Sequence, residues 1–303
     1  MRILVVGAGA TGGYFGARLA QTGRDVTFLV RERRFQQLQQ NGLALNTPEG
    51  RTVLTPQLAQ ASTLSGHFDL IIITVKSFAL EQAMNDIAPA VGPETLLLPV
   101  LNGMRHIDTL QARFGDKVIG GLCKIHATLN ENGEVMQMSP LHTLNYGALD
   151  GNNDARLQRV DAALRGAQFD AVLSGNIISE LWEKWLLLST LGAVCCLTRG
   201  DTRQVLTSDG GEALLQGIFA EVLAVIAADG YPQRPAVTAK IFETLNNPDA
   251  AMTSSMYRDL LQGYAIEADQ IIGDLLARGA RHAVATPLLN AVYVNLQMYL
   301  QTR

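Results

Sequence analysis

The sequence predicts an α/β domain followed by an all-helical domain, and three observations support this fold class. The chain has 303 residues, which favours two domains over a single core. Its first half alternates short apolar strands with helical segments, as a parallel sheet with crossover helices requires. After about residue 172 the strand signals stop and only helical spacing remains. We therefore expect an α/β domain over 1–172 and a helical domain over 173–303.

Four segments of the first half are rich in β-branched and aliphatic residues and predict the strands of a parallel sheet: Arg2–Val6, Asp25–Val30, Phe68–Val75 and Thr95–Val100. The last two are near-continuous apolar runs, typical of strands that are buried on both faces. Helical spacing predicts helices over Thr11–Gln21 and Arg33–Gln40. Between Lys117 and Tyr146, short strands interrupted by the turn sequence NENG predict an antiparallel extension.

Four long segments of the second half carry apolar residues at helical spacing and predict the helical domain: Ser179–Leu197, Gly211–Ala228, Ala265–Ala277 and Pro287–Leu300. The apolar character of this half leaves open a homodimer interface through the helical domain.

Composition and charge exclude several classes of function. The net charge of −4 gives no reason to expect nucleic acid or an anionic membrane as a partner. Three cysteines, two of them adjacent, form neither a disulfide framework nor a metal site, and the five histidines show no ligand spacing. The apolar run Trp185–Thr198 is shorter than the roughly 20 residues of a membrane span, and the N-terminus does not resemble a signal peptide. We expect a cytoplasmic protein without a bound metal.

The motif G-x-G-x-x-G, formed by Gly7, Gly9 and Gly12, follows the first strand and opens the first helix. The first glycine allows a tight turn, the second lets a pyrophosphate approach the backbone, and the third lets the helix pack against the strand. Free N–H groups at the start of the helix then face the phosphates. The sequence therefore predicts a Rossmann-type domain that binds a dinucleotide through six consecutive residues: Gly7, Ala8, Gly9, Ala10, Thr11 and Gly12.

The residues after the second strand bear on which dinucleotide binds. An acid at this place suits the ribose 2′-hydroxyl of NAD, whereas an arginine suits the 2′-phosphate of NADP. The sequence here is Arg31, Glu32, Arg33 and Arg34. Three guanidinium groups favour a phosphate and hence NADP(H), with Arg31 first off the strand, while Glu32 keeps NAD open. A solvated helix start of mixed charge is the simpler alternative.

Two polar residues follow the buried strands of the sheet. Lys76 comes after the strand Phe68–Val75, and Asn102 comes after Thr95–Val100. Ligands of parallel α/β sheets bind at the carboxyl ends of the strands, so we expect both residues to contact the cofactor. Without a ligand, Lys76 would be a surface charge and Asn102 a turn residue before Gly103.

The helical half offers Lys184 and Glu267 as candidate catalytic residues. Lys184 is the only basic residue between Arg165 and Arg199 and lies in an apolar helical stretch. An ammonium group partly removed from water gives up its proton more readily and can act as a general acid. The alternatives are a lysine that extends to the surface beside its acidic neighbours, and a Glu267 that faces water from its helix.

In order and spacing, several short motifs resemble the ketopantoate reductase (2-dehydropantoate 2-reductase) family: GAGATGG, VKS, LNGM, WEK and SSM…IEAD. The resemblance covers the whole chain and implies an NADPH-dependent reductase of pantothenate synthesis, with a Rossmann domain, a helical domain and an active site in the cleft between them. It makes Lys184 the acid that protonates the ketone oxygen and Glu267 an active-site residue that contacts cofactor or substrate hydroxyls. It also implies roles for five further residues, which are Ser255 on the substrate carboxylate, Lys76 and Asn102 beside the nicotinamide and its ribose, Arg31 on the 2′-phosphate, and Ala127 as a cofactor-contacting backbone position.

The chain departs from the family pattern at two positions. Members that make pantoate carry asparagines four and eight residues after the lysine, where this chain has Leu188 and Gly192. Ser189 and Thr190 lie off that helical face and substitute imperfectly. The resemblance thus implies reduction of a small 2-keto acid, with 2-dehydropantoate as the leading substrate. A more apolar keto acid is the main alternative, and a non-catalytic NADP sensor is a further one.

Overall fold

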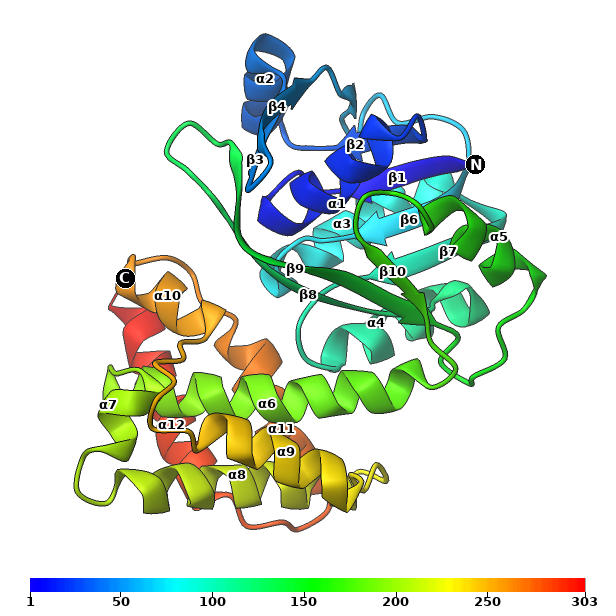
Figure 1. Cartoon of the computed structure of the whole chain (residues 1–303). Coiled ribbons are helices and arrows are strands. Elements are labelled where there is room, and N and C mark those ends of the chain that lie inside the picture. Colours follow the sequence, from blue (N-terminus) through cyan, green and yellow to red (C-terminus); the bar gives the residue numbers. More distant parts are fainter. Residues whose placement is uncertain (303) are drawn as a thin grey trace. The chain divides into compact units, whose positions relative to one another are not determined.

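The computed structural model describes residues 1–302, which form two compact units: 1–101 with 106–178, and 102–105 with 179–302. The fold class is as predicted, with a parallel-sheet α/β unit and a helical unit (Figure 1). The sequence pattern places the division at residue 172, whereas the compact units change at residue 178. The strand β10 (Asp170–Leu173) runs across the expected boundary.

The first unit is built on a five-stranded parallel sheet of order β5-β2-β1-β6-β7. Its strands are β1 (Arg2–Val6), β2 (Asp25–Leu29), β5 (Gln57–Ala59), β6 (Phe68–Ile73) and β7 (Val91–Pro99). A second sheet of order β10-β9-β3-β4, with β8 paired to β9, consists of β3 (Leu43–Thr47), β4 (Gly50–Leu54), β8 (Gly120–Leu129), β9 (Val135–Gly147) and β10. The predicted antiparallel extension is the β8–β9 pair.

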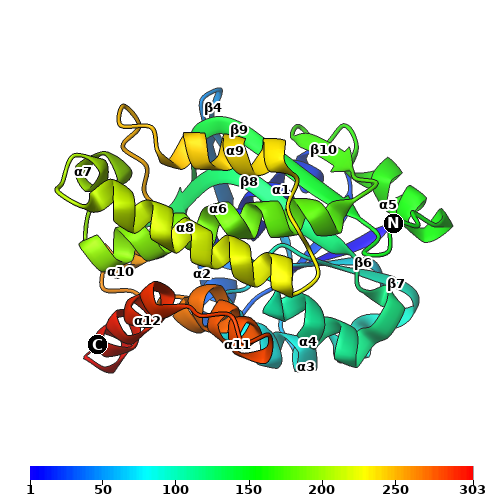
Figure 2. The same cartoon turned by 90° about the horizontal axis from the view of Figure 1, so that it is seen from below.

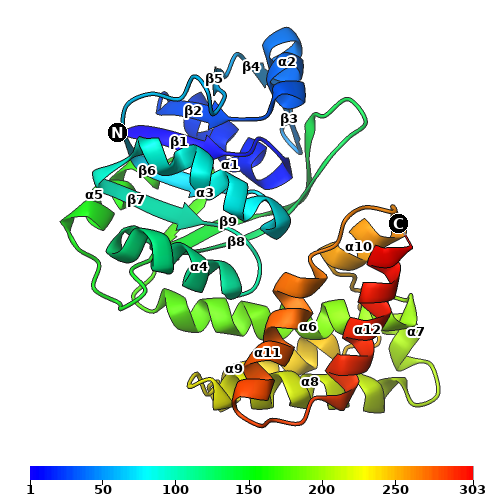
Figure 3. The same cartoon turned by 180° about the vertical axis from the view of Figure 1, so that it is seen from behind.

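Both faces of the parallel sheet are buried, because alternate residues of each strand point to opposite sides. From β1, Ile3 and Val5 enter a core shared with α1 (Ala10–Gln21), α5 (Ala155–Leu164) and the second sheet. Leu4 and Val6 enter a core on the other face with α3 (Leu80–Ile87) and α4 (Arg105–Phe114), which cover that face in Figure 3. The helix α2 (Glu32–Asn41) follows β2. The sheet thereby holds the carboxyl end of β1, and the glycine motif after it, in a fixed frame.

The second unit consists of helices: α6 (Ile177–Thr198), α7 (Thr202–Leu206), α8 (Gly211–Ala228), α9 (Pro235–Leu245), α10 (Ser255–Leu261), the π-helix η4 (Asp269–Gly273), α11 (Asp274–Arg281) and α12 (Pro287–Gln301). Figure 2 shows α9 on one side of the long helices α6 and α8, and α11 and α12 on the other. The predicted helix over Ala265–Ala277 is wrong at its start, because residues 265–267 are irregular and the chain then enters the wide π-turn.

Two helices, α6 and α8, are long and apolar enough to cross a membrane by length and composition alone. The run Trp185–Thr198 is shorter than a membrane span, but it is only part of α6. The whole helix has 22 residues, so the prediction that this segment is too short to cross a membrane is wrong for α6. Two thirds of its apolar window is buried inside the protein (67%), as in the core helix of a soluble domain.

Candidate functional site

The loop between β1 and α1 has the backbone that the glycine motif predicts. Gly7 has φ +94°, a left-handed conformation that favours glycine, and its N–H donates to the Leu29 carbonyl (3.0 Å). A Cβ on Gly12 would lie 2.1 Å from the Gly7 carbonyl oxygen and 2.2 Å from Thr74 Oγ1, so only glycine fits there. Gly9 differs, because no atom lies within 4 Å of the place of its Cβ. The loop therefore needs glycine at Gly7 for its backbone conformation and at Gly12 for lack of room, and it leaves open space at Gly9.

The open space lies at the start of α1, where Gly9 is the N-cap residue. The first intrahelical bond runs from the Gly13 N–H to the Gly9 carbonyl (2.8 Å), and the N–H groups before it have no intrahelical partner. The first turn contains no acidic residue. Such a helix start attracts an anion through its N–H groups and dipole, and the missing side chain lets that anion approach. The residues fit the pyrophosphate of a dinucleotide.

Three of the four charged residues after β2, Arg31, Glu32 and Arg34, differ in their surroundings. Arg31 is the exposed N-cap residue of α2, and among residues 1–302 it has no ion-pair partner. The carboxylate of Glu32 accepts hydrogen bonds from Gln36 and from Gln60 (2.5 Å). Arg34 does not face solvent with Arg31, because its Nε donates to the Ala8 carbonyl (3.0 Å) inside the glycine loop. The prediction that three guanidinium groups meet one phosphate is therefore wrong for Arg34.

Two other predicted cofactor residues belong to the first unit. Lys76, three residues after the end of β6, is exposed and is the N-cap residue of the short helix η1 (Ser77–Ala79). Ala127 is half-buried in β8 and pairs with Gln137, after an irregularity in the register between Ile125 and Ala127. The contacts of both residues with a cofactor stay predictions.

Asn102 belongs to the second unit and is hydrogen-bonded there to Gln270. The Gln270 side chain donates from Nε2 to the Asn102 carbonyl (3.0 Å). Next along the chain, Gly103 has φ +83°, and a Cβ there would lie 2.8 Å from the Gln270 carbonyl oxygen. The segment that leaves β7 therefore packs directly on η4. No sequence signal indicates Gln270, which is 168 residues away from Asn102.

Lys184 is held beside the same π-helix. The indole Nε1 of the next residue, Trp185, donates to the Ile271 carbonyl (3.2 Å), which fixes this part of α6 against η4. Lys184 itself is half-buried, and within residues 1–302 no hydrogen bond or ion pair engages its ammonium group. The adjacent acid Glu183 pairs instead with Arg234 (2.7 Å). The Lys184 ammonium group is thus on an apolar helix that is fixed against η4, and within residues 1–302 no carboxylate binds it. The adjoining π-helix is itself of interest, because π-helical turns are frequent at functional sites.

Glu267 immediately precedes the helical segment, so its predicted place on a helix is wrong. Its carbonyl accepts from the Ile271 N–H (3.0 Å), and the residue is only 8% exposed. Burial excludes the alternative in which Glu267 faces water. Ser254 is the buried N-cap of α10, with Oγ accepting from the Tyr257 N–H (3.0 Å), while Ser255 is exposed in the first turn. Of the two serines, Ser255 is the exposed one.

The face of α6 that continues from Lys184 is apolar. Leu188 is half-buried one turn on. At Gly192 a Cβ would lie 3.0 Å from Met256 Cε, so the buried Met256 side chain fills the space that a larger residue would use. Ser189 and Thr190 are fully buried, and the Ser189 hydroxyl donates to the Trp185 carbonyl (2.6 Å). Neither replaces the missing asparagines from this position.

Comparison with known proteins gives consistent results for both halves. The model of a family described as ketopantoate reductase PanE/ApbA matches residues 3–151, and the model of its C-terminal domain matches residues 176–300. Over 300 residues the chain is 35% identical to the uncharacterized oxidoreductase YkpB of Bacillus subtilis, with 99% of each chain covered. It is 26% identical over 291 residues to a 2-dehydropantoate 2-reductase of Streptococcus pyogenes serotype M18, covering 95% of this chain and 94% of that one. The crystal structure of a 2-dehydropantoate 2-reductase from Methylococcus capsulatus matches with a TM-score of 0.87 and 26% identity, covering 100% of this chain and 97% of that one.

Proposed function

The chain belongs to the ketopantoate reductase family, whose members are nicotinamide-dependent oxidoreductases acting on a CH–OH group, and we propose that it reduces 2-dehydropantoate to pantoate with NADPH in the cytoplasm. The observation that carries this proposal is Lys184. Within residues 1–302 no acid pairs with this half-buried ammonium group, which is fixed on an apolar helix next to the Trp185–Ile271 hydrogen bond. The group can therefore donate its proton to an acceptor on the substrate. A developing alkoxide oxygen is such an acceptor.

NADPH supplies a hydride for the substrate carbonyl carbon when it is bound. Lys184 holds the proton that the carbonyl oxygen takes up, and its positive charge stabilises the oxygen as negative charge develops. Glu267, held in place by η4, contacts hydroxyl groups of cofactor or substrate, and Ser255 holds the substrate carboxylate. Asn102 and Lys76 lie beside the nicotinamide and its ribose, and the backbone at Ala127 contacts the cofactor.

The surroundings of Arg31 and of Glu32 support NADPH over NADH as the cofactor. Arg31 is exposed at the start of α2, where a 2′-phosphate would lie, and it has no ion-pair partner among residues 1–302. The carboxylate of Glu32 is already bound by Gln36 and Gln60. An acid that serves NAD accepts a hydrogen bond from the ribose 2′-hydroxyl. We therefore expect Glu32 to stay with its glutamines and Arg31 to meet the phosphate.

A second substrate class is favoured by the packing around Gly192. Leu188 and Met256 line this side of α6, and Met256 occupies the volume that an asparagine at position 192 would need. Two lost hydrogen bonds would cost about 1–3 kcal/mol of binding to a substrate hydroxyl. An apolar 2-keto acid such as 2-ketoisovalerate loses nothing by their absence.

Homodimer formation through the helical unit is part of the proposal. Four large apolar side chains of this unit are more than half exposed: Leu261, Tyr264, Val294 and Met298. Light scattering on the purified chain should give twice the monomer mass.

The function is tested by following NADPH oxidation at 340 nm with 2-dehydropantoate, 2-ketoisovalerate and unbranched 2-keto acids, each repeated with NADH. Preference for 2-dehydropantoate supports the first proposal, and preference for 2-ketoisovalerate supports the second. No turnover with any 2-keto acid, by protein that binds NADPH, would refute both.

A further inference from the structure

We propose that Arg34, held by the tip of the β8–β9 hairpin, is a positioning residue that orients the dinucleotide-binding loop. The proposal rests on the proposed function, because it presupposes that the loop binds NADPH. It differs from a role in recognising the 2′-phosphate, which the neighbouring Arg31 has.

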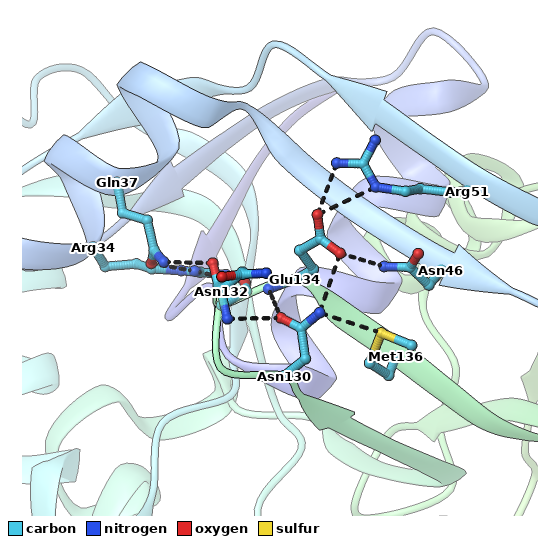
Figure 4. A network of polar contacts seen from close by, with 9 residues as sticks. Arg34, Gln37, Asn46, Arg51, Asn130, Asn132, Glu134 and Met136 are labelled. Atoms are coloured by element: carbon cyan, nitrogen blue, oxygen red, sulfur yellow. Dashed lines mark hydrogen bonds and ion pairs between the residues drawn. The ribbon is translucent and has the colours of Figure 1, made fainter.

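The guanidinium group of Arg34 connects two segments that are far apart in the sequence. Its Nε donates to the Ala8 carbonyl (3.0 Å) in the glycine motif, and its Nη1 donates to the Gly133 carbonyl (2.8 Å) at the hairpin tip. Nη1 also donates to Gln37 Oε1 (2.6 Å), and Gln37 Nε2 donates to the Asn132 carbonyl (2.7 Å). Figure 4 shows Arg34 and Gln37 side by side against the tip.

The contact with Ala8 determines where the next N–H group points. In a trans peptide the carbonyl and the following N–H point in opposite directions, and none of the peptide bonds in the described part of the chain (1–302) is cis. Holding the Ala8 carbonyl therefore fixes the direction of the Gly9 N–H. Gly9 is the N-cap of α1 and is the glycine with open space beside it. Arg34 thus fixes a donor at the place where the pyrophosphate would bind.

The hairpin tip is itself built to be rigid. Asn130 Oδ1 accepts from the N–H groups of Asn132 (3.1 Å) and Glu134 (2.9 Å), and the Gly133 N–H donates to the Asn130 carbonyl (2.9 Å). The Glu134 carboxylate is then held by Arg51 (2.7 Å), as Figure 4 shows. The Gly133 carbonyl that accepts from Arg34 therefore belongs to a turn that is held by Asn130 and by the Arg51–Glu134 ion pair.

Arg34 carries out this role without a neutralising acid. Its hydrogen-bond acceptors are two backbone carbonyls and one amide oxygen, and within residues 1–302 no carboxylate forms an ion pair with it. Its planar fork can reach Ala8 and Gly133 together, which a lysine ammonium cannot do with the same geometry. The arrangement affects the loop that both dinucleotides share and has no contact that depends on the 2′-phosphate.

The test measures the Kd of NADPH and of NADH by fluorescence titration for the wild type and four variants. We expect Arg34→Gln and Arg34→Lys each to raise the Kd of NADPH and the Kd of NADH by a similar factor of about ten. Asn130→Ala, which leaves every arginine in place, should raise both Kd values by a smaller factor. Arg159→Gln removes an equal charge from an exposed ion pair on α5 and should change neither Kd. Thermal unfolding of each variant establishes that it is folded.

Three results would overturn the proposal. Loss of NADPH affinity alone in Arg34→Gln would make Arg34 a phosphate ligand. Full rescue by Arg34→Lys would show that charge suffices without the bridge. Unchanged affinity for both dinucleotides in a folded Arg34→Gln would show that the bridge does not affect binding. If the wild type bound neither dinucleotide, the proposed function would fail first, which the wild-type titration shows separately.

Discussion

Two glycines of the same motif should respond in opposite ways to replacement by alanine. At Gly9 the added methyl group meets no atom within 4 Å, and the backbone (φ −79°) is open to any residue. Alanine reduces the flexibility of the unfolded chain, which stabilises the folded protein, but it is a poorer N-cap than glycine, which destabilises α1. The two effects roughly offset each other, so we expect the free energy of unfolding to change by less than about 1 kcal/mol. The methyl group nevertheless occupies the space through which a pyrophosphate would approach, and NADPH affinity should fall at least about tenfold, or about 1.4 kcal/mol.

At Gly12 the same methyl group would overlap the Gly7 carbonyl oxygen at 2.1 Å and Thr74 Oγ1 at 2.2 Å. The Thr74 hydroxyl also bonds the Val6 and Gly7 carbonyls (2.9 and 3.0 Å), so displacing it disturbs those contacts as well. Overpacking costs about 1–3 kcal/mol and a lost hydrogen bond about 1 kcal/mol. The Gly12→Ala variant should therefore unfold roughly 5–15 °C below the wild type.

Differential scanning fluorimetry without ligand, followed by NADPH titration, measures both effects on the same samples. Unchanged NADPH affinity in Gly9→Ala would refute the assignment of the open space to the dinucleotide. A Gly12→Ala variant as stable as the wild type would show that the close packing of α1 on the loop is not needed.

Three further predictions concern stability and reactivity. Replacing Arg278, whose side chain is 6% exposed and pairs with two buried carboxylates, by leucine should lower the free energy of unfolding by about 3–5 kcal/mol in urea denaturation, and an unchanged midpoint would contradict this. Iodoacetamide at pH 8 should label Cys123 first in mass spectrometry, because burial raises the pKa of Cys195 to about 11 and of Cys196 to about 12, and equally fast labelling of all three would disprove it. Hydrogen bonds, above all from the Arg51 guanidinium group, lower the pKa of Glu134. The stabilising effect of the Glu134 carboxylate is therefore present at neutral pH and is lost as pH falls through the lowered pKa. The difference in Tm between the wild type and Glu134→Gln should close between pH 7 and pH 3, and a constant difference would contradict this.

The sequence predicted best the parts that depend on local pattern. The strands β1, β2 and β6 lie close to the predicted bounds, because runs of β-branched and apolar residues indicate buried strands. The strand β7 begins four residues before the predicted Thr95, because its first residues do not belong to the apolar run. The turn at Gly7 and the tight packing at Gly12 follow from the motif itself. The family and the reductase class followed from the order of short motifs along the whole chain.

The features that sequence reasoning missed depend on contacts between distant segments. The strand β4 (Gly50–Leu54) is almost wholly exposed, so its sequence carries no alternating apolar pattern. The link between Asn102 and Gln270 spans 168 residues and uses a backbone carbonyl, which has no signature in the sequence. Arg34 and Arg31 look alike in the sequence, and only their burial separates the loop-binding arginine from the exposed one.

The central claim is that Lys184 supplies the proton for reduction of a 2-keto acid, and a Lys184→Ala variant tests it most directly. The measurement is the single-turnover rate of NADPH oxidation with saturating 2-keto acid, beside the Kd of NADPH. The account predicts that the rate falls by about 10²- to 10⁴-fold while the Kd stays within a few-fold of the wild type. A variant that oxidises NADPH as fast as the wild type would contradict the account.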